Sequence, residues 1–161
     1  MVMRYLKFTI CFIFSLSTQF LNAQSNISIN PSGVYKYDGK TYRKNGETYG
    51  YFGTVKVLQL SSTKILVSFY VCKGAPSYNS GSFVDSLDYS NNQATYLGDT
   101  SMIETTCKLI FHFTAQRINI ELFSEYPNMA CGFGHAVDAQ GLYKKVGAKP
   151  PIMEEIVREA D

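Results

Sequence analysis

The sequence predicts an all-β protein: a single antiparallel up-and-down barrel, or a tightly curled sheet, of about eight strands. The chain has 161 residues, of which 45% are hydrophobic and only 17% are charged. This composition suits one folded domain and excludes a disordered chain or a long charged helix. Short segments of alternating apolar and polar residues follow one another, separated by turn-forming pairs, which is the pattern of consecutive hairpins.

The first 23 residues are expected to be an export signal. Arg4 and Lys7 precede an apolar run over residues 8–16, and Ala23 ends a cleavage site. The run is shorter than the roughly 20 residues that span a bilayer, so we expect no membrane anchor after processing. The protein is therefore predicted to be secreted or periplasmic.

The mature chain would carry no net charge. Without the signal, 138 residues remain, with 13 basic and 13 acidic side chains. No cluster of lysine and arginine is left, so neither nucleic acid nor an anionic membrane is an expected partner. We expect the barrel domain over residues 24–147 and a C-terminal tail or short helix over residues 148–161.

Turn-forming pairs delimit the first strands. Residues 33–37 are expected to form a strand that ends at the Asp-Gly pair 38–39, and the Asn-Gly pair 45–46 predicts a hairpin. Residues 55–60 and 65–72 alternate in the manner of strands.

Two local features refine the middle of the chain. The alternation of the segment 55–60 changes phase between Val57 and Leu58, which predicts a β-bulge there. Residues 83–89 and 94–97 flank an Asn-Asn pair and are expected to form another hairpin.

Residues 108–114 and 117–123 predict the best-defined hairpin, with its turn at residues 115–116. This register places the apolar residues of both strands on one face, as cross-strand packing requires. Residues 141–145 would form the closing strand. The expected pairs are Leu109 with Leu122, Phe111 with Ile120, and Phe113 with Ile118.

The cysteines suggest one disulfide. In an oxidising compartment, the mature cysteines Cys72, Cys107 and Cys131 favour one bond and one remaining thiol. The hairpin register sets Cys107 opposite Ser124, and a bend after that strand can return Cys131 to it. We therefore predict a Cys107–Cys131 disulfide, stabilising the fold by about 3 kcal/mol, and a buried, unpaired Cys72.

No arrangement of residues indicates catalysis. His112 is expected on the outward face of its strand, and His135 follows Cys131 within one short glycine-rich segment. Gly132 and Gly134 allow a tight bend that would place the ring between them in the core. The chain contains no recognisable metal or nucleotide motif. We therefore expect a protein that is not an enzyme and takes no cofactor or metal.

Two features suggest binding instead. Eleven tyrosines belong to the mature chain, and five of them lie between residues 35 and 51. Tyrosine suits both a half-exposed strand face and a recognition surface. A polar stretch over residues 73–83 joins two apolar strands, and such loops on a rigid scaffold often bind partners. Its candidate binding residues are Tyr78, Asn79, Ser80, Gly81, Ser82 and Phe83.

This combination of an export signal, a small β domain, a disulfide and a Ser-Gly loop resembles the periplasmic lysozyme inhibitors of Gram-negative bacteria. In several of those proteins a Ser-Gly loop enters the catalytic cleft of the lysozyme. The resemblance implies that Ser80 and Gly81 play this part, with a cell-wall hydrolase as the protein partner. The chain departs from that pattern at Phe83, where the inhibitors usually have a tyrosine.

The ends of the domain are also similar to those of calycins. Residues 33–35 and 141–144 match the glycine and aromatic residues near the two ends of that family. This resemblance implies an alternative function, the transport of a small apolar ligand. An eight-stranded barrel either holds one ligand or is filled by side chains, and the many Phe and Tyr residues predict a filled interior. Residues 131–143 resemble uncharacterised exported bacterial proteins.

Overall fold

The structure is a computed structural model that describes residues 28–98, 107–124, 131–147 and 149–157. The predicted export signal lies outside these residues. Within them, the chain forms nine strands and one short helix. In chain order these are β1 (Gly33–Tyr37), β2 (Tyr42–Lys44), β3 (Glu47–Gln59), β4 (Lys64–Gly74), β5 (Ser80–Ser90), β6 (Gln93–Leu97), β7 (Cys107–Phe113), β8 (Arg117–Ser124), β9 (Gly141–Gly147) and α1 (Met153–Val157).

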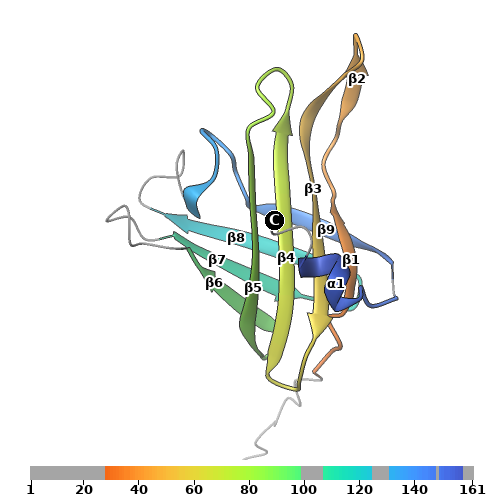
Figure 1. Ribbon diagram of the computed structural model, residues 1–161, viewed down its shortest axis with the longest axis vertical. Helices are drawn as coiled ribbons and strands as arrows, with labels where there is room; N and C mark the ends of the chain where they lie inside the picture. The colour runs from red at the N-terminus through yellow and green to blue at the C-terminus, as the bar shows by residue number, and fades with distance from the viewer. Residues whose placement is uncertain (1–27, 99–106, 125–130, 148, 158–161) are drawn as a thin grey trace, which may run out of the picture.

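Eight of the strands form a closed antiparallel barrel (Figure 1). From β3 to β9 each strand pairs with the next one in the chain, and β1 closes the barrel by pairing with both β3 and β9. β2 pairs with the first part of β3 and extends the sheet beyond the barrel. The predicted up-and-down barrel is therefore confirmed, with one additional short strand.

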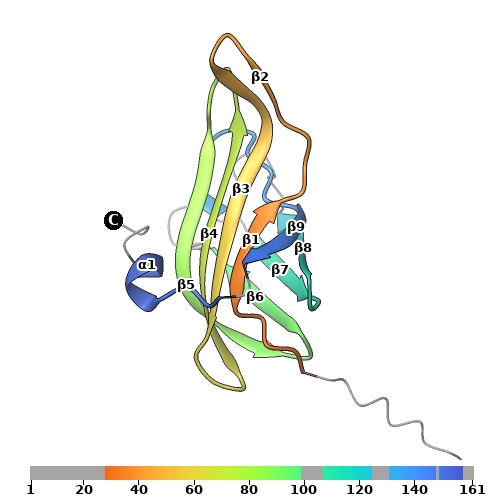
Figure 2. The same cartoon turned by 90° about the vertical axis from the view of Figure 1, so that its right-hand side faces the viewer.

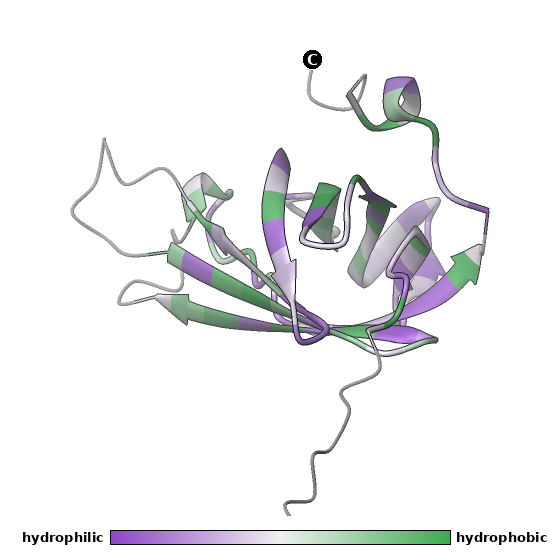
Figure 3. Cartoon of the chain, turned by 90° about the horizontal axis from the view of Figure 1, so that it is seen from below, coloured by the Kyte–Doolittle hydropathy of each residue, from purple (hydrophilic) through white to green (hydrophobic). Residues whose placement is uncertain are grey.

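Alternating side chains build the interior. The hydropathy colouring changes repeatedly between apolar and polar along the strands (Figure 3), and β7 alternates buried with more exposed residues throughout. The ring of Phe69 is central to this core, because four other rings lie with their centres 5.3–6.3 Å from its own. Aromatic side chains thus fill the middle of the barrel. The four rings belong to Phe83, Phe111, Phe133 and Tyr143.

The β7–β8 hairpin has the register that its sequence predicts. Phe111 lies opposite Ile120, and Phe113 lies opposite Ile118. All four side chains are buried. A slip by one residue would replace the two isoleucines with polar neighbours, so burial on one face holds the register.

The N-terminal residues close one end of the barrel, which we call the base. This end carries the β3–β4 and β5–β6 turns, at the bottom of Figure 1, and the β7–β8 turn, before which the amide of Phe113 donates to the carbonyl of Asn92 at 2.8 Å. The buried hydroxyl of Tyr35 donates to the carbonyl of Pro31 at 2.7 Å, and that of Tyr89 donates to the carbonyl of Ile29 at 2.9 Å. The amide of Gln59 donates to the hydroxyl of Ser32. These bonds tie the segment before β1 across the base.

A segment of residues 131–140, which we call the plug, crosses the opposite end, or tip. The predicted disulfide joins Cys131 to Cys107 at the start of β7. Phe133 is buried and stacks on Phe69, as the flanking glycines predict. The hydroxyl of Tyr51 donates to the carbonyl of Ala136 at 2.8 Å. The plug therefore belongs to the core rather than to an outer loop.

The predicted β-bulge at Val57 and Leu58 is wrong. These residues pair without interruption with Val67 and Leu66, and the irregularity of this ladder lies between Tyr49 and Phe52. Leu58 and Leu66 are both half-buried on the outer face of the barrel. An apolar residue on that face therefore needs no change of phase.

Within the predicted C-terminal segment, residues 153–157 form a short helix. α1 lies against the outside of β4, and the side chain of Ile156 is fully buried. Its place beside the outer wall of the barrel is visible in Figure 2.

Candidate binding site at the barrel tip

A two-stranded arm of residues 42–49 extends beyond the barrel at the tip (Figure 2). It consists of β2, a two-residue turn and the beginning of β3, with Tyr42 opposite Tyr49. Residues 38–50 contain no aliphatic side chain. The segment has little to bury, so it stands clear of the core.

The turn of the arm has the conformation that its sequence predicts. Asn45 and Gly46 have φ angles of 51° and 82°. Positive φ at both positions is typical of a type I′ turn, which matches the twist of a hairpin. The arm is thus a preformed hairpin rather than an irregular loop.

Two stacked tyrosines form one side of the arm. The rings of Tyr42 and Tyr49 lie 5.1 Å apart and nearly parallel, at 7°. The Tyr49 hydroxyl donates to the Glu47 carboxylate at 3.2 Å, and this bond raises the pKa of Tyr49 above its usual value. The side chain of Tyr42 remains 61% exposed. An exposed, stacked ring is an apolar contact surface that loses little side-chain entropy on binding.

The β4–β5 turn, residues 75–79, supports the arm from the barrel side. The amide of Ala75 donates to the carbonyl of Thr48 at 2.7 Å, and the amide of Thr48 donates to the hydroxyl of Tyr78 at 3.0 Å. Tyr78 has a positive φ of 50° and remains 41% exposed. The arm and this turn together form the surface that we call the tip site.

The tip site carries more positive than negative charge. On the arm, Arg43 and Lys44 are exposed and Glu47 is the one acidic residue, and Lys40, which is exposed just before β2, adds a further positive charge. At the root of the arm, Asp38 is already paired with Lys144 at 2.8 Å. The outer end of the arm is therefore cationic.

Of the predicted loop residues, Tyr78 and Asn79 belong to the tip site. Tyr78 is exposed on the turn, while Asn79 is half-buried and donates from its side-chain amide to the carbonyl of His135 at 2.8 Å. Asn79 therefore fastens the turn to the plug.

The other four predicted residues, Ser80 to Phe83, lie in strand β5, so the expectation of a protruding Ser-Gly tip is wrong. Ser80 pairs with Cys72, and its carbonyl accepts from the amide of Gly134 at 2.9 Å. Gly81 is buried beneath the ring of Phe133, which an added Cβ would overlap. This glycine makes room for the plug.

Ser82 and Phe83 lie on opposite faces of β5. Ser82 is exposed on the outer wall opposite Tyr70. Phe83 points inward, where its ring stacks on that of Tyr96, with centres 3.7 Å apart. The structure therefore does not bring these two side chains together with the tip turn.

Sequence reasoning did not select Tyr42 and Arg43 as site residues. A usable signal was present, because an Asn-Gly turn inside a stretch without aliphatic residues indicates a hairpin that cannot be packed into a core. The cluster of tyrosines before residue 52 pointed to the same stretch.

Neither histidine belongs to the tip site. His112 faces outward beside Glu121, with Nε2 3.5 Å from the carboxylate oxygen, and His135 is exposed on the plug. Cys72 is buried as a free thiol, as predicted. Among the described residues, no group of three or more His, Cys, Asp or Glu side chains converges as metal ligands would.

Comparison of the chain with protein-family models, with curated proteins and with solved structures finds no match. Among the helical residues that the structure describes, none belongs to a segment long and apolar enough to cross a membrane.

Proposed function

We propose that the mature chain is an exported binding protein that inhibits a glycan-cleaving cell-wall hydrolase. The tip site would enter the substrate cleft of that enzyme. The observation that carries this proposal is the preformed arm, which projects beyond the barrel and presents an exposed tyrosine beside cationic side chains.

The shape of the tip suits a cleft. A hairpin that is already ordered loses little conformational entropy when it is bound. The arm is held at its root by the β4–β5 turn, which is in turn fastened to the plug through Asn79. The plug is attached to β7 by the disulfide. Binding would therefore need little rearrangement of the tip.

The chemistry of the tip also suits this target. Glycoside hydrolases generally use a pair of carboxylates flanking the scissile bond. Lys40, Arg43 and Lys44 would be attracted to such an acidic cleft, and this attraction favours correct orientation and fast association. The ring of Tyr42 offers an apolar face that can occupy the place of a sugar ring.

Transport of a small apolar ligand has less support. The interior described above is occupied by the rings around Phe69, and the two ends are covered by the N-terminal segment and the plug.

The proposal can be tested by mixing residues 24–161 with a panel of lysozymes in a peptidoglycan-clearing assay. We expect the protein to slow clearing by at least one lysozyme. Tyr42→Ala and Arg43→Glu should each weaken this inhibition by at least tenfold, because exposed Tyr and Arg side chains often dominate binding energy.

Matched changes at the base serve as controls. Leu60→Ala and Arg117→Glu alter exposed side chains at the opposite end of the barrel, and they should leave inhibition unchanged. If the protein slows clearing by none of the lysozymes in the panel, the proposed function is wrong. If the wild type and both tip variants inhibit equally well, the tip site is not the inhibitory surface.

A further inference from the structure

The barrel wall has a seam between β5 and β6. These strands pair only beside their turn, at Tyr89 with Ala94 and at Ser90 with Gln93. On its other side, β5 pairs with β4 all the way from Asp88 to Ser80. The wall is therefore continuous at β4–β5 and splits above the β5–β6 turn.

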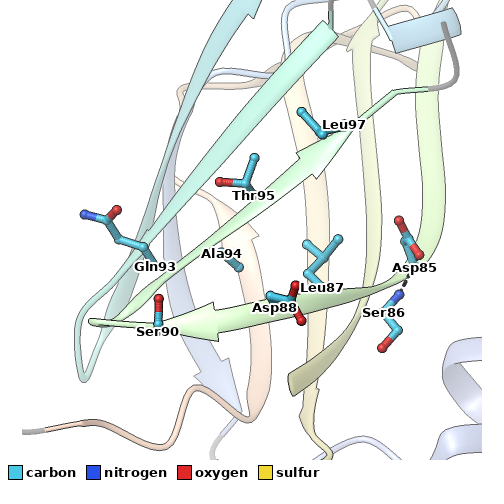
Figure 4. A pocket seen from close by; sticks show the side chains of 9 residues that line it. All are labelled: Asp85, Ser86, Leu87, Asp88, Ser90, Gln93, Ala94, Thr95 and Leu97. Atoms are coloured by element: carbon cyan, nitrogen blue, oxygen red, sulfur yellow. Dashed lines mark hydrogen bonds between the residues drawn. The ribbon is translucent and has the colours of Figure 1, made fainter. Parts of the chain in front are cut away.

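A cleft of about 470 Å³ occupies the seam (Figure 4). One side is formed by residues 85–88 of β5, and the other by Ala94, Thr95 and Leu97 of β6. In Figure 4 the two strands diverge from their turn, with Leu87 and Ala94 between them. The cleft is thus bounded by two strand edges rather than by loops.

Side chains close the inner side of the seam. Phe83 of β5 and Tyr96 of β6 stack with an interplanar angle of 6°. Leu87 and Ala94, nearer the turn, are buried. These contacts hold the two halves of the wall together where the backbone ladder is missing, so the cleft opens outward.

The facing edges need a particular kind of partner. Along a strand, the N–H and C=O groups of alternate residues point toward each neighbour. Residues 85–88 are paired with β4 on one side, and residues 94–97 are paired with β7 on one side. By that alternation the backbone groups of Asp88, Thr95 and Leu97 face the cleft, because the amides of Tyr89 and Gly98 donate to the carbonyls of Thr63 and Cys107 on the outer sides. The amide of Ser86 lies on the cleft side too, but it already donates to the Asp85 carboxylate. An extended peptide satisfies open edge groups by adding a strand.

The charge of the cleft selects among peptides. Asp85 and Asp88 line it, and none of its nine lining residues is basic. The Asp88 carboxylate forms an ion pair with the ammonium group of Lys64 on β4, at 3.2 Å. The Asp85 carboxylate accepts a hydrogen bond from the amide of Ser86. Aliphatic contact is offered by Leu87 inside the cleft and by Leu97, which is 67% exposed.

We propose that the seam binds an extended segment of a partner protein, about four residues long, that contains both basic and aliphatic side chains. β5 and β6 run antiparallel to each other. The added strand would therefore be parallel to one of them and antiparallel to the other. The length follows from the four consecutive residues of β5, Asp85 to Asp88, that line the cleft. The proposal is independent of the tip site and of hydrolase inhibition.

The direct test is an NMR titration of ¹⁵N-labelled residues 24–161 with the peptide acetyl-Val-Val-Lys-Lys-Val-Val-amide. Amide signals of residues 85–88 and 95–97 should shift, and hydrogen exchange of amides in these two segments should slow. Slowed exchange reports new backbone hydrogen bonds, which a loose electrostatic contact would not produce.

Two altered peptides separate backbone pairing from charge. The same peptide with N-methyl groups at alternate residues keeps every side chain and loses half of its N–H donors. It should cause neither the shifts nor the protection. The peptide with glutamates in place of the lysines should bind at least threefold more weakly.

A protein variant tests the charge from the other side. Asp85→Asn should weaken binding of the lysine peptide about threefold, the effect of losing one partly exposed ion pair. Glu121→Gln, on the outer face of β8, is the matched control and should have no effect.

Three results would overturn the proposal. The first is the absence of shifts at the seam at millimolar peptide. The second is equal binding of the N-methylated peptide. The third is self-association of the protein, seen by sedimentation velocity, that protects these same amides without any peptide.

Discussion

Tyr35 and Tyr143 are equally buried, but only the hydroxyl of Tyr35 has a hydrogen-bond partner among the described residues. Both Tyr35 and Tyr143 are fully buried in the barrel. The Tyr35 hydroxyl donates to the carbonyl of Pro31, whereas the Tyr143 hydroxyl has no partner among the described residues. Burial raises the pKa of each phenol well above its ordinary value.

Tyr143→Phe should stabilise the protein at neutral pH by about 1 kcal/mol, because it removes a buried polar group without a partner. Tyr35→Phe should destabilise it by about 1 kcal/mol, because it leaves the Pro31 carbonyl unpaired. Urea denaturation at pH 7 measures both free energies of unfolding. Destabilisation by both substitutions would mean that the Tyr143 hydroxyl is hydrogen-bonded.

The same variant has a signature at high pH. Above pH 10 the unfolded tyrosines lose their protons while Tyr35 and Tyr143 keep theirs, so the folded state binds more protons. Stability is therefore full below pH 10 and falls as pH rises, by about 1.4 kcal/mol per pH unit for each residue. Other tyrosines with a raised pKa, among them Tyr37 and Tyr89, add to the slope, and Tyr143→Phe should reduce it by the share of one residue, about 1.4 kcal/mol per pH unit.

The inward orientation of these tyrosines was not predictable from local sequence. Residues 33–37 and 141–145 were assigned to strands, and both assignments hold. Tyrosine, however, suits either face of a strand, since its ring is apolar and its hydroxyl is polar. The choice of face depends on barrel closure, which brings β1 beside both β3 and β9.

At the scale of elements, the plug packs directly against strand β5. Phe133 lies over Gly81 and stacks on Phe69. Its buried ring and the absence of a side chain at position 81 depend on each other, although 52 positions separate them in the sequence.

Gly81→Ala should destabilise the protein by about 2 kcal/mol, because the added methyl overlaps the Phe133 ring. In a Phe133→Ala background the same change should cost less than about 0.5 kcal/mol, which a double-mutant cycle in urea measures. Gly147→Ala is the control, since an added Cβ there meets only Val34 at ordinary contact distance. Equal costs in both backgrounds would contradict the packing.

The contact between Gly81 and Phe133 also shows why some elements could be predicted from the sequence and others could not. The register of the β7–β8 hairpin was predictable to the residue, because its apolar residues lie close along the chain and its turn is short. Residues Ser80 to Ser82 were misassigned to a loop because serine and glycine are poor strand formers. A glycine is needed at position 81 of the strand because the ring of Phe133, far away in the sequence, packs there.

At the scale of the whole molecule, the two ends of the barrel differ. At the base, the hydroxyls of Tyr35 and Tyr89 donate hydrogen bonds to carbonyls of the N-terminal segment. The tip is covered by the plug and continues into the cationic arm. Closure and the disulfide were predictable from alternation and cysteine placement. The arm as a projection was not predicted, because that depends on where β3 leaves the barrel.

The central claim is that the tip binds and the base does not. Its most direct test is hydrogen–deuterium exchange of residues 24–161, alone and in complex with the lysozyme that they inhibit most strongly. We predict slower exchange in residues 40–49 and 75–79, with the base turns 60–64 and 114–117 unchanged. Protection at the base turns with none on the arm, or no protection by any lysozyme of the panel, would contradict the claim.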